Sequence, residues 1–252
     1  MSTIIYWFSG TGNSLYTAKL LADELGDTDL RPIAAGVPPE ELGGNGQKVG
    51  LVFPSYYGNL PRIVRSFVEQ LKIREGTYLF TVVTMGGLGQ GSVAALDLLL
   101  KGKNLRLDYG RTILMNGNYV INYNTADKTK VENKLNKTDK KIRLISSQIH
   151  AGLQSVKKIK FIAHNLYKNI ESLDLQFFAE DSCTACGQCA KICPVGNIKI
   201  KDNKPCWLHH CEHCVACISW CPAQAIQYGG KTKTRRRYQN PKITVDELLI
   251  KS

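Results

Sequence analysis

The chain of 252 residues has no cysteine among its first 182 residues, although it contains nine cysteines in all. All nine fall between Cys183 and Cys221, and this abrupt change in composition indicates a domain boundary. The sequence also lacks any run of about 20 apolar residues, which a membrane-spanning helix would require. With 43% hydrophobic and 21% charged residues, the chain is typical of a globular protein with a buried core.

The first residues, Met1–Phe8, lack both the basic segment and the small-residue cleavage site of a secretory signal peptide. We therefore expect a cytoplasmic protein, in a compartment where structural disulfides are rare. Nine cysteines in such a protein favour metal ligation over disulfide bonds.

The cysteines form two copies of one motif. The run Cys183-x2-Cys186-x2-Cys189-x3-Cys193-Pro194 recurs 28 residues later as Cys211-x2-Cys214-x2-Cys217-x3-Cys221-Pro222. This is the bacterial two-cluster spacing, in which the fourth cysteine of each run ligates the other cluster. The spacing predicts two [4Fe–4S] clusters, one held by Cys183, Cys186, Cys189 and Cys221, the other by Cys211, Cys214, Cys217 and Cys193. Residues 177–228 resemble the two-[4Fe–4S] bacterial-type ferredoxin module.

Zinc is the alternative ligand for cysteine clusters, but zinc sites usually use two separated cysteine pairs without a trailing proline. The ninth cysteine, Cys206, lies outside both motifs and is expected to be an inert thiol. Three histidines near the second motif are expected to surround the cluster or lie on the surface, namely His209, His210 and His213.

The first 155 residues read as strands alternating with helices. Buried strands are expected at 4–8, 49–53, 78–84 and within 105–115, with a short one near Leu30–Ile33. Helical stripes follow at 15–25, 63–71 and 92–100 and from about Thr138, with Asn59 as the N-cap of the second helix. Strict alternation predicts a parallel sheet covered on both faces, and the flavodoxin-like order 2-1-3-4-5 suits this length.

Open α/β sheets bind ligands at the carboxyl ends of their strands, near the switch in strand order. Three distinctive loops fall there, at 9–14, 54–59 and 84–91. The first joins a strand to a helix N-terminus and suits a phosphate, whereas it has neither the lysine of a Walker loop nor the third glycine of a dinucleotide fingerprint. The second has two adjacent tyrosines that suit a flat ring, and the third has four glycines that allow a ligand close to the backbone.

These loops resemble the FMN site of flavodoxins. The resemblance implies phosphate contacts from Ser9, Thr11, Gly12, Asn13 and Ser14. It implies flavin contacts in the second loop from Pro54, Ser55, Tyr56, Tyr57 and Gly58. It also implies flavin contacts in the third loop from Thr84, Met85, Gly86 and Gly87. Tyr119 is expected on the other face of the flavin ring. A doubly wound domain that binds nothing, as in response regulators, is the alternative for such loops.

Overall, the chain resembles flavodoxin–ferredoxin fusion proteins. The expected organisation is a flavodoxin-like FMN domain at 1–155, a connecting helix or segment at 156–176, a ferredoxin domain at 177–228 and a basic tail at 229–252. The net charge of +12 departs from typical flavodoxins and ferredoxins, which are acidic. Basic residues gather in 128–160 and 231–237, which are either solvated surfaces or docking sites for soluble redox partners that are acidic at their docking face. Nucleic acid is the third alternative, but no recognition motif accompanies the charge.

The expected function is therefore electron transfer between FMN and two [4Fe–4S] clusters, and onward to soluble partner proteins. No residue is arranged as a general base or nucleophile. The alternatives are an FMN-dependent reductase of a small substrate and a basic iron–sulfur protein that binds nucleic acid.

Overall fold

The computed structural model describes residues 2–33, 41–87, 91–125, 127–156 and 174–249. A six-stranded parallel sheet forms the N-terminal domain, in the order β2-β1-β4-β6-β7-β8. The first five of these strands are β2 (Thr28–Pro32), β1 (Thr3–Trp7), β4 (Lys48–Pro54), β6 (Tyr78–Met85) and β7 (Tyr109–Leu114). This is the expected flavodoxin-like order, extended at one edge by β8 (Ser155–Val156), which pairs with β7.

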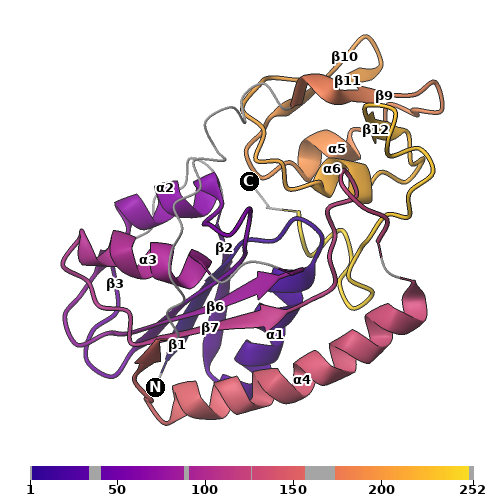
Figure 1. Cartoon of the computed structure of the whole chain (residues 1–252). Coiled ribbons are helices and arrows are strands. Elements are labelled where there is room, and N and C mark those ends of the chain that lie inside the picture. The colour runs from indigo at the N-terminus through magenta and orange to yellow at the C-terminus, as the bar shows by residue number, and fades with distance from the viewer. Residues whose placement is uncertain (1, 34–40, 88–90, 126, 157–173, 250–252) are drawn as a thin grey trace.

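Helices cover both faces of the sheet (Figure 1). On one face α1 (Asn13–Leu25) packs against α4 (Lys128–His150), and on the other α2 (Arg62–Gln70) lies beside α3 (Gly91–Lys101). The two-residue strands β3 (Glu41–Leu42) and β5 (Lys72–Ile73) pair in parallel apart from the main sheet. The central strands are nearly all buried, which explains their continuous apolar sequences.

Two details of the expected helices were wrong. The helix expected from about Thr138 begins at Lys128, because Asp127 caps it by accepting a hydrogen bond from the Lys130 amide (2.9 Å). The N-cap of α2 is Pro61 rather than Asn59. The expected connecting helix falls largely on residues 157–173, which lie outside the described residues.

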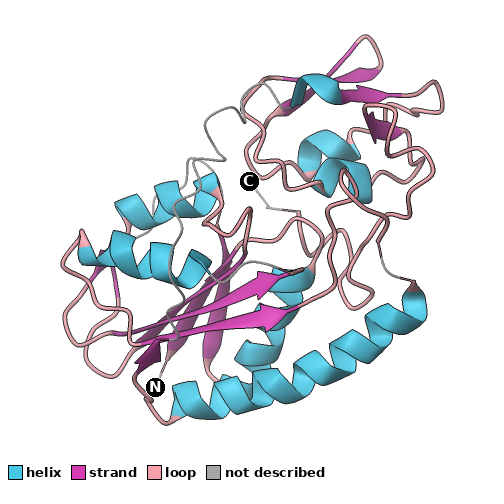
Figure 2. Cartoon of the chain, in the orientation of Figure 1, coloured by secondary structure: helices cyan, strands magenta, loops and turns pink. Residues whose placement is uncertain are grey.

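The C-terminal region is smaller and has short antiparallel sheets (Figure 2). Strand β9 (Phe177–Ala179) pairs with β12 (Ile226–Tyr228), and β10 (Ile198–Lys201) pairs with β11 (Lys204–Trp207). Two single-turn helices complete it, α5 (Gln188–Lys191) and α6 (Ala216–Ser219). In Figure 1 this region lies beyond the arrowheads of β6 and β7, which is where ligands bind in open α/β sheets.

The two regions share their hydrophobic cores. Val120 and Ile121, from the segment that follows β7, are buried in the core of the C-terminal region. Trp220 and Ile192, from the C-terminal region, are buried in the core of the sheet domain. This exchange of side chains fixes the cysteine-rich region on the sheet. None of the helices in the described parts of the chain has the length and apolar character needed to cross a membrane.

Candidate functional site

The fold gathers the cysteines of the two motifs into crossed sets. Cys189, in α5, is close enough to Cys221, Cys186 and Cys183 for their charges to affect its thiol. Cys193, from the first motif, lies instead beside Cys211 and Cys214. One hollow is lined by the four cysteines Cys193, Cys211, Cys214 and Cys217. Cys193 thus lies with the cysteines of the second motif, and Cys221 lies near those of the first.

Burial controls the protonation of these thiols. Burial, together with the charges of neighbouring thiols, raises the pKa of Cys189 to about 11 and that of Cys211 to about 12. The pKa values of the fully buried Cys214 and Cys217 are raised well above the ordinary value for the same reason. Cationic metal centres bound there would offset this cost, because cysteine ligates metals as the thiolate.

Backbone amides point at two of the sulfurs. Asn197 N lies 3.2 Å from Cys193 Sγ, and His213 N lies 3.3 Å from Cys211 Sγ. Hydrogen bonds of this kind tune the potential of iron–sulfur clusters. Four converging soft donors and their amide partners fit a [4Fe–4S] cluster, which would supply one-electron transfer there. Within the described residues, no three His, Cys, Asp or Glu side chains form a group that would hold a single metal ion.

The second cysteine set lies against the loop between β1 and α1. Trp220 Nε1 donates a hydrogen bond to the carbonyl of Gly10 (3.1 Å). A Cβ atom at Gly10 would lie 2.4 Å from the carbonyl oxygen of Cys214. Only glycine allows this approach between the sheet domain and the second cysteine motif.

A second contact joins the regions at the start of α2. The amide of Arg62 donates to the carboxylate of Glu212 (2.5 Å), and the Arg62 Nε atom lies 3.7 Å from the same carboxylate. An acidic group at a helix N-terminus is favourable, because the first amides carry partial positive charge. Burial nonetheless raises the pKa of Glu212 to about 7, and the Arg62 charge opposes that rise.

The loop expected to hold phosphate is filled by the protein itself. Thr11, Asn13 and Ser14 are 1%, 7% and 0% exposed. Asn240 N donates to Thr11 O (2.8 Å), and Tyr238 Oη donates to Asn13 Oδ1 (2.6 Å). A Cβ atom at Gly12 would lie 2.9 Å from the Cβ atom of Asn240.

Polar groups of this loop also have partners inside the protein. The amides of Gly12 and Ser14 donate to Ser9 Oγ at 3.1 and 3.3 Å. Ser14 Oγ lies 2.7 Å from Thr84 Oγ1, and Thr11 Oγ1 accepts from Asn118 Nδ2 (2.7 Å). The loop therefore leaves no room for the phosphate of FMN in this conformation.

The residues expected around the flavin ring occupy the same edge of the sheet. Pro54 pairs with Thr84 at the ends of β4 and β6, and Ser55 N donates to Thr84 O (2.7 Å). Tyr56 packs edge-on against Phe8. Gly86 approaches Gly117 so closely that a Cβ atom at Gly86 would lie 2.9 Å from the Gly117 Cα atom.

Two tyrosines connect this edge to the second cysteine motif. Tyr57 has a left-handed backbone (φ 51°) and is followed by Gly58 (φ 78°), and its hydroxyl lies 2.7 Å from that of Tyr119. The Tyr119 hydroxyl in turn lies 2.6 Å from Nδ1 of His213. These side chains thus contact the cysteine-rich region in this conformation.

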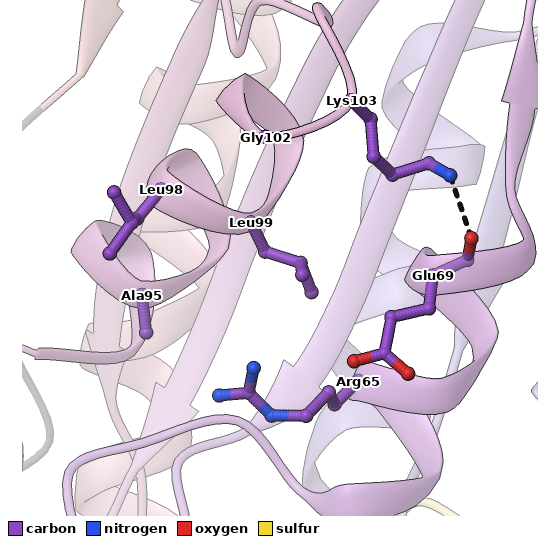
Figure 3. Close-up of a pocket in the computed structure, with 7 residues that line it drawn as sticks. All are labelled: Arg65, Glu69, Ala95, Leu98, Leu99, Gly102 and Lys103. Carbon is purple, nitrogen blue, oxygen red and sulfur yellow. Dashed lines mark hydrogen bonds between the residues drawn. The ribbon is translucent and has the colours of Figure 1, made fainter.

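Beside these closed loops, an open cleft of about 580 Å³ remains at the same edge of the sheet. Its lining includes Gly86, Gly87 and Tyr123, together with charged residues from the start of α4 and from the C-terminal segment. A different hollow of about 340 Å³ lies between α2 and α3 (Figure 3). In Figure 3 Arg65 and Glu69 of α2 face the side chain of Leu99 on α3. None of the residues that line this hollow is a cysteine or belongs to a predicted site.

The sequence did not reveal the role of the C-terminal segment, 229–249. It was expected as a basic tail, yet Tyr238 and Asn240 are buried on the loop after β1, and Arg237 donates to the carbonyl of Ile226 (2.8 Å). The one signal in the sequence was the run Arg237-Tyr238-Gln239-Asn240-Pro241, in which an aromatic and two amide residues follow the basic residues.

Comparisons with known proteins match the two regions separately. The family model "4Fe-4S binding domain" matches residues 177–199. A flavoprotein from Lactobacillus acidophilus, solved with FMN, is 12% identical, with 44% of this chain and 92% of that chain covered at a TM-score of 0.34. An FMN-dependent NADH-azoreductase from Bacillus anthracis, also solved with FMN, is 12% identical, with 60% and 100% covered at a TM-score of 0.38. No curated protein matches the chain. The flavodoxin-like fold of the N-terminal domain rests on its strand order, and the 4Fe–4S match covers residues 177–199 of the C-terminal region.

Proposed function

We propose that the protein is an electron carrier whose C-terminal region holds two [4Fe–4S] clusters with crossed ligation. The observation that carries the proposal is the grouping of Cys193 with Cys211, Cys214 and Cys217 around one hollow. Cys217 is also affected by the charge of Cys189, which belongs to the other set. Two clusters this close together would pass single electrons from one to the other.

The first test is the iron content after anaerobic purification. Two four-thiolate clusters require about eight iron atoms and eight sulfides per chain. About four iron atoms per chain would indicate a single cluster, and stoichiometric zinc in place of iron would contradict the proposal.

Crossed ligation has a sharper test in paired substitutions. Cys193→Ser with Cys211→Ser removes two ligands of one cluster, so about four iron atoms should remain. Cys193→Ser with Cys183→Ser removes one ligand from each cluster and should deplete both. Uncrossed ligation predicts the reverse pattern, so the two double variants serve as controls for each other.

That the protein binds FMN remains a prediction from the sequence. The contacts that fill the loop after β1 do not favour binding of the FMN phosphate in that loop. The full proposal of a one-chain relay between FMN and the clusters therefore depends on the flavin content of the same anaerobic preparation. The partners we propose are soluble redox proteins with an acidic docking face, which would suit the basic surface of α4.

The alternative is a reductase of a small substrate, which the open cleft beside Gly86 and Gly87 favours. Rapid reaction kinetics separate the two functions. A carrier reduced by dithionite should reduce an acceptor protein in a single phase without turnover of small molecules, whereas sustained turnover of a small substrate would support the reductase.

A further inference from the structure

The arginines of the basic run near the C-terminus bind backbone carbonyls inside the molecule. Arg235 donates to the carbonyl of Val120 (2.9 Å), and Arg236 Nε donates to that of Thr125 (3.3 Å). Both carbonyls belong to the connection between β7 and α4. The third arginine of the run, Arg237, binds a different part of the chain, within the cysteine-rich region.

Arg237 binds the segment that carries Cys221. Its guanidinium donates to the carbonyls of Ile218 (2.5 Å), Gln224 (2.7 Å) and Ile226 (2.8 Å). One of these residues precedes Cys221 in the chain and two follow it, so the arginine spans the segment that presents this thiol. The planar fork of a guanidinium has five N–H donors, which allows one side chain to hold three carbonyls at once.

The charge of Arg237 lies close to a ligand of each predicted cluster. Burial lowers the pKa of Arg237, while the charges of Cys221 and then of Cys217 oppose that shift. Cys221 belongs to the first ligand set, the one that contains Cys183, and Cys217 belongs to the second. Because arginine keeps its proton in proteins, Arg237 places a permanent positive charge beside both sets, with the stronger effect at Cys221.

The hydrogen bonds of Arg237 leave this charge uncompensated, because their three acceptors are neutral carbonyls. Glu180 is the carboxylate whose charge affects Arg237, and it forms an ion pair with Lys233 (2.6 Å). The second set has a different arginine beside it, Arg62, whose Nε atom lies 3.7 Å from the carboxylate of Glu212. A carboxylate thus faces the arginine at the second set, whereas Arg237 adds net positive charge at the first.

We propose that Arg237 is a positioning residue of the iron–sulfur region, which holds the segment of Cys221 in place and raises the reduction potential of the first cluster. Net charge and hydrogen bonding are among the factors that set such potentials, and a nearby cation favours the more negative, reduced cluster. The inference rests on the proposed function, since it requires that the cysteine sets bind clusters. It gives Arg237 a role inside the protein, separate from the docking of a partner.

The effect of the charge is tested by the reduction potentials of the two clusters, from a redox titration of the complete, anaerobically purified chain followed by electron paramagnetic resonance. Arg237→Gln should make reduction of the first cluster about tenfold less favourable, a shift of about 59 mV to lower potential for one electron, and should affect the second cluster less. The double variant Cys193→Ser with Cys211→Ser, which should keep the first cluster only, assigns its potential. Arg236→Gln makes the same change in net charge at an exposed position and should leave both potentials unchanged.

The positioning role has a separate measurement, the release of iron to a chelator. Arg237→Lys keeps the charge but lacks the planar fork, so about half of the iron, that of the first cluster, should be released faster than from the wild type. The potential of the first cluster in Arg237→Lys should stay closer to that of the wild type than in Arg237→Gln.

Three outcomes decide the inference. Unchanged potentials in Arg237→Gln would overturn the role of the charge, and release of iron from Arg237→Lys at the wild-type rate would overturn the positioning role. If Arg237→Gln folds, as judged by thermal unfolding, but retains only about four iron atoms, the positioning role is supported. Failure of the proposed function is distinguishable, because the wild-type chain itself would then lack the expected iron.

Discussion

At the scale of single residues, Gly10 decides how closely the second cysteine motif can approach the sheet domain. Its backbone faces the carbonyl of Cys214, and it accepts a hydrogen bond from Trp220. We predict that Gly10→Ala destabilises the protein by about 1–3 kcal/mol, because an added methyl group in a tightly packed interface forces backbone to move. The free energy of unfolding of the holoprotein, measured with a denaturant, checks the value.

The control for Gly10→Ala is Gly230→Ala. A Cβ atom at Gly230 would meet no atom within 4 Å, and its backbone needs no left-handed conformation. Gly230→Ala should therefore have the same free energy of unfolding as the wild type. If Gly10→Ala also matched the wild type in stability and in cluster absorption spectrum, the close contact between Gly10 and Cys214 would be wrong.

At the scale of elements, the C-terminal segment is fastened to α1 by Glu247. Its carboxylate pairs with Lys19 of α1 and accepts hydrogen bonds from the amide (2.7 Å) and hydroxyl (2.9 Å) of Thr244. The Lys19 hydrogen bond, followed by the Thr244 amide, lowers the pKa of Glu247 below its ordinary value of 4.5. Since the pKa is lower in the folded state, this stabilisation is fully present above about pH 4.5 and is lost as the pH falls through the folded value.

We predict that Glu247→Gln speeds amide hydrogen exchange in residues 244–248 at pH 7. The effect is small, below about 1 kcal/mol, because the pair is partly exposed to solvent. The difference between variant and wild type should shrink as the pH falls below 4.5 and through the lowered pKa of Glu247, because its side chain then becomes uncharged like that of the glutamine. A difference that stays constant with pH would show that the charge of Glu247 does not hold the segment.

The elements differ in how far the sequence alone could predict them. Strands β1, β4 and β6 are runs of mostly buried apolar residues, which makes them readable from the sequence, whereas β7 is only partly buried. The start of α4 was missed because residues 128–137 are mostly polar, so only the cap at Asp127 marks it. The docking of Asn240 on Thr11 joins residues more than 200 positions apart, and no local pattern encodes such a contact.

The candidate site, too, could be predicted from the sequence only in part. The ligand sets of the two expected clusters could be predicted from spacing alone, because short loops and single helical turns set where each thiol can reach. The phosphate loop depends on what covers it, which spacing does not reveal. The sequence therefore predicted a ligand-binding edge, whereas the opening that remains at that edge depends on the packing of the C-terminal segment.

At the scale of the whole molecule, charge is concentrated on α4. This helix has seven basic and two acidic residues, and one acid, Asp139, accepts a hydrogen bond from Tyr16 Oη (2.8 Å). Lys137, Lys140 and Lys141 are exposed, and Lys140 and Lys141 lie three and four positions after Lys137, so both neighbour it in one stripe on the helix surface. A stripe of one sign attracts an oppositely charged partner before contact and increases the rate of encounter.

We predict that electron transfer to an acidic redox protein slows as salt increases, because the Debye length falls from about 10 Å at 0.1 M to about 3 Å at 1 M. The triple variant Lys137→Glu, Lys140→Glu and Lys141→Glu should show a lower bimolecular rate constant at low salt and a weaker salt dependence. Stopped-flow kinetics with an acidic ferredoxin or flavodoxin as acceptor measure both. The charge-matched control changes three exposed lysines elsewhere to glutamate, Lys72, Lys199 and Lys201. Since both triple variants alter the net charge equally, a stripe that docks the partner requires the α4 variant to be slower, and equal rates in the two would assign the effect to net charge alone.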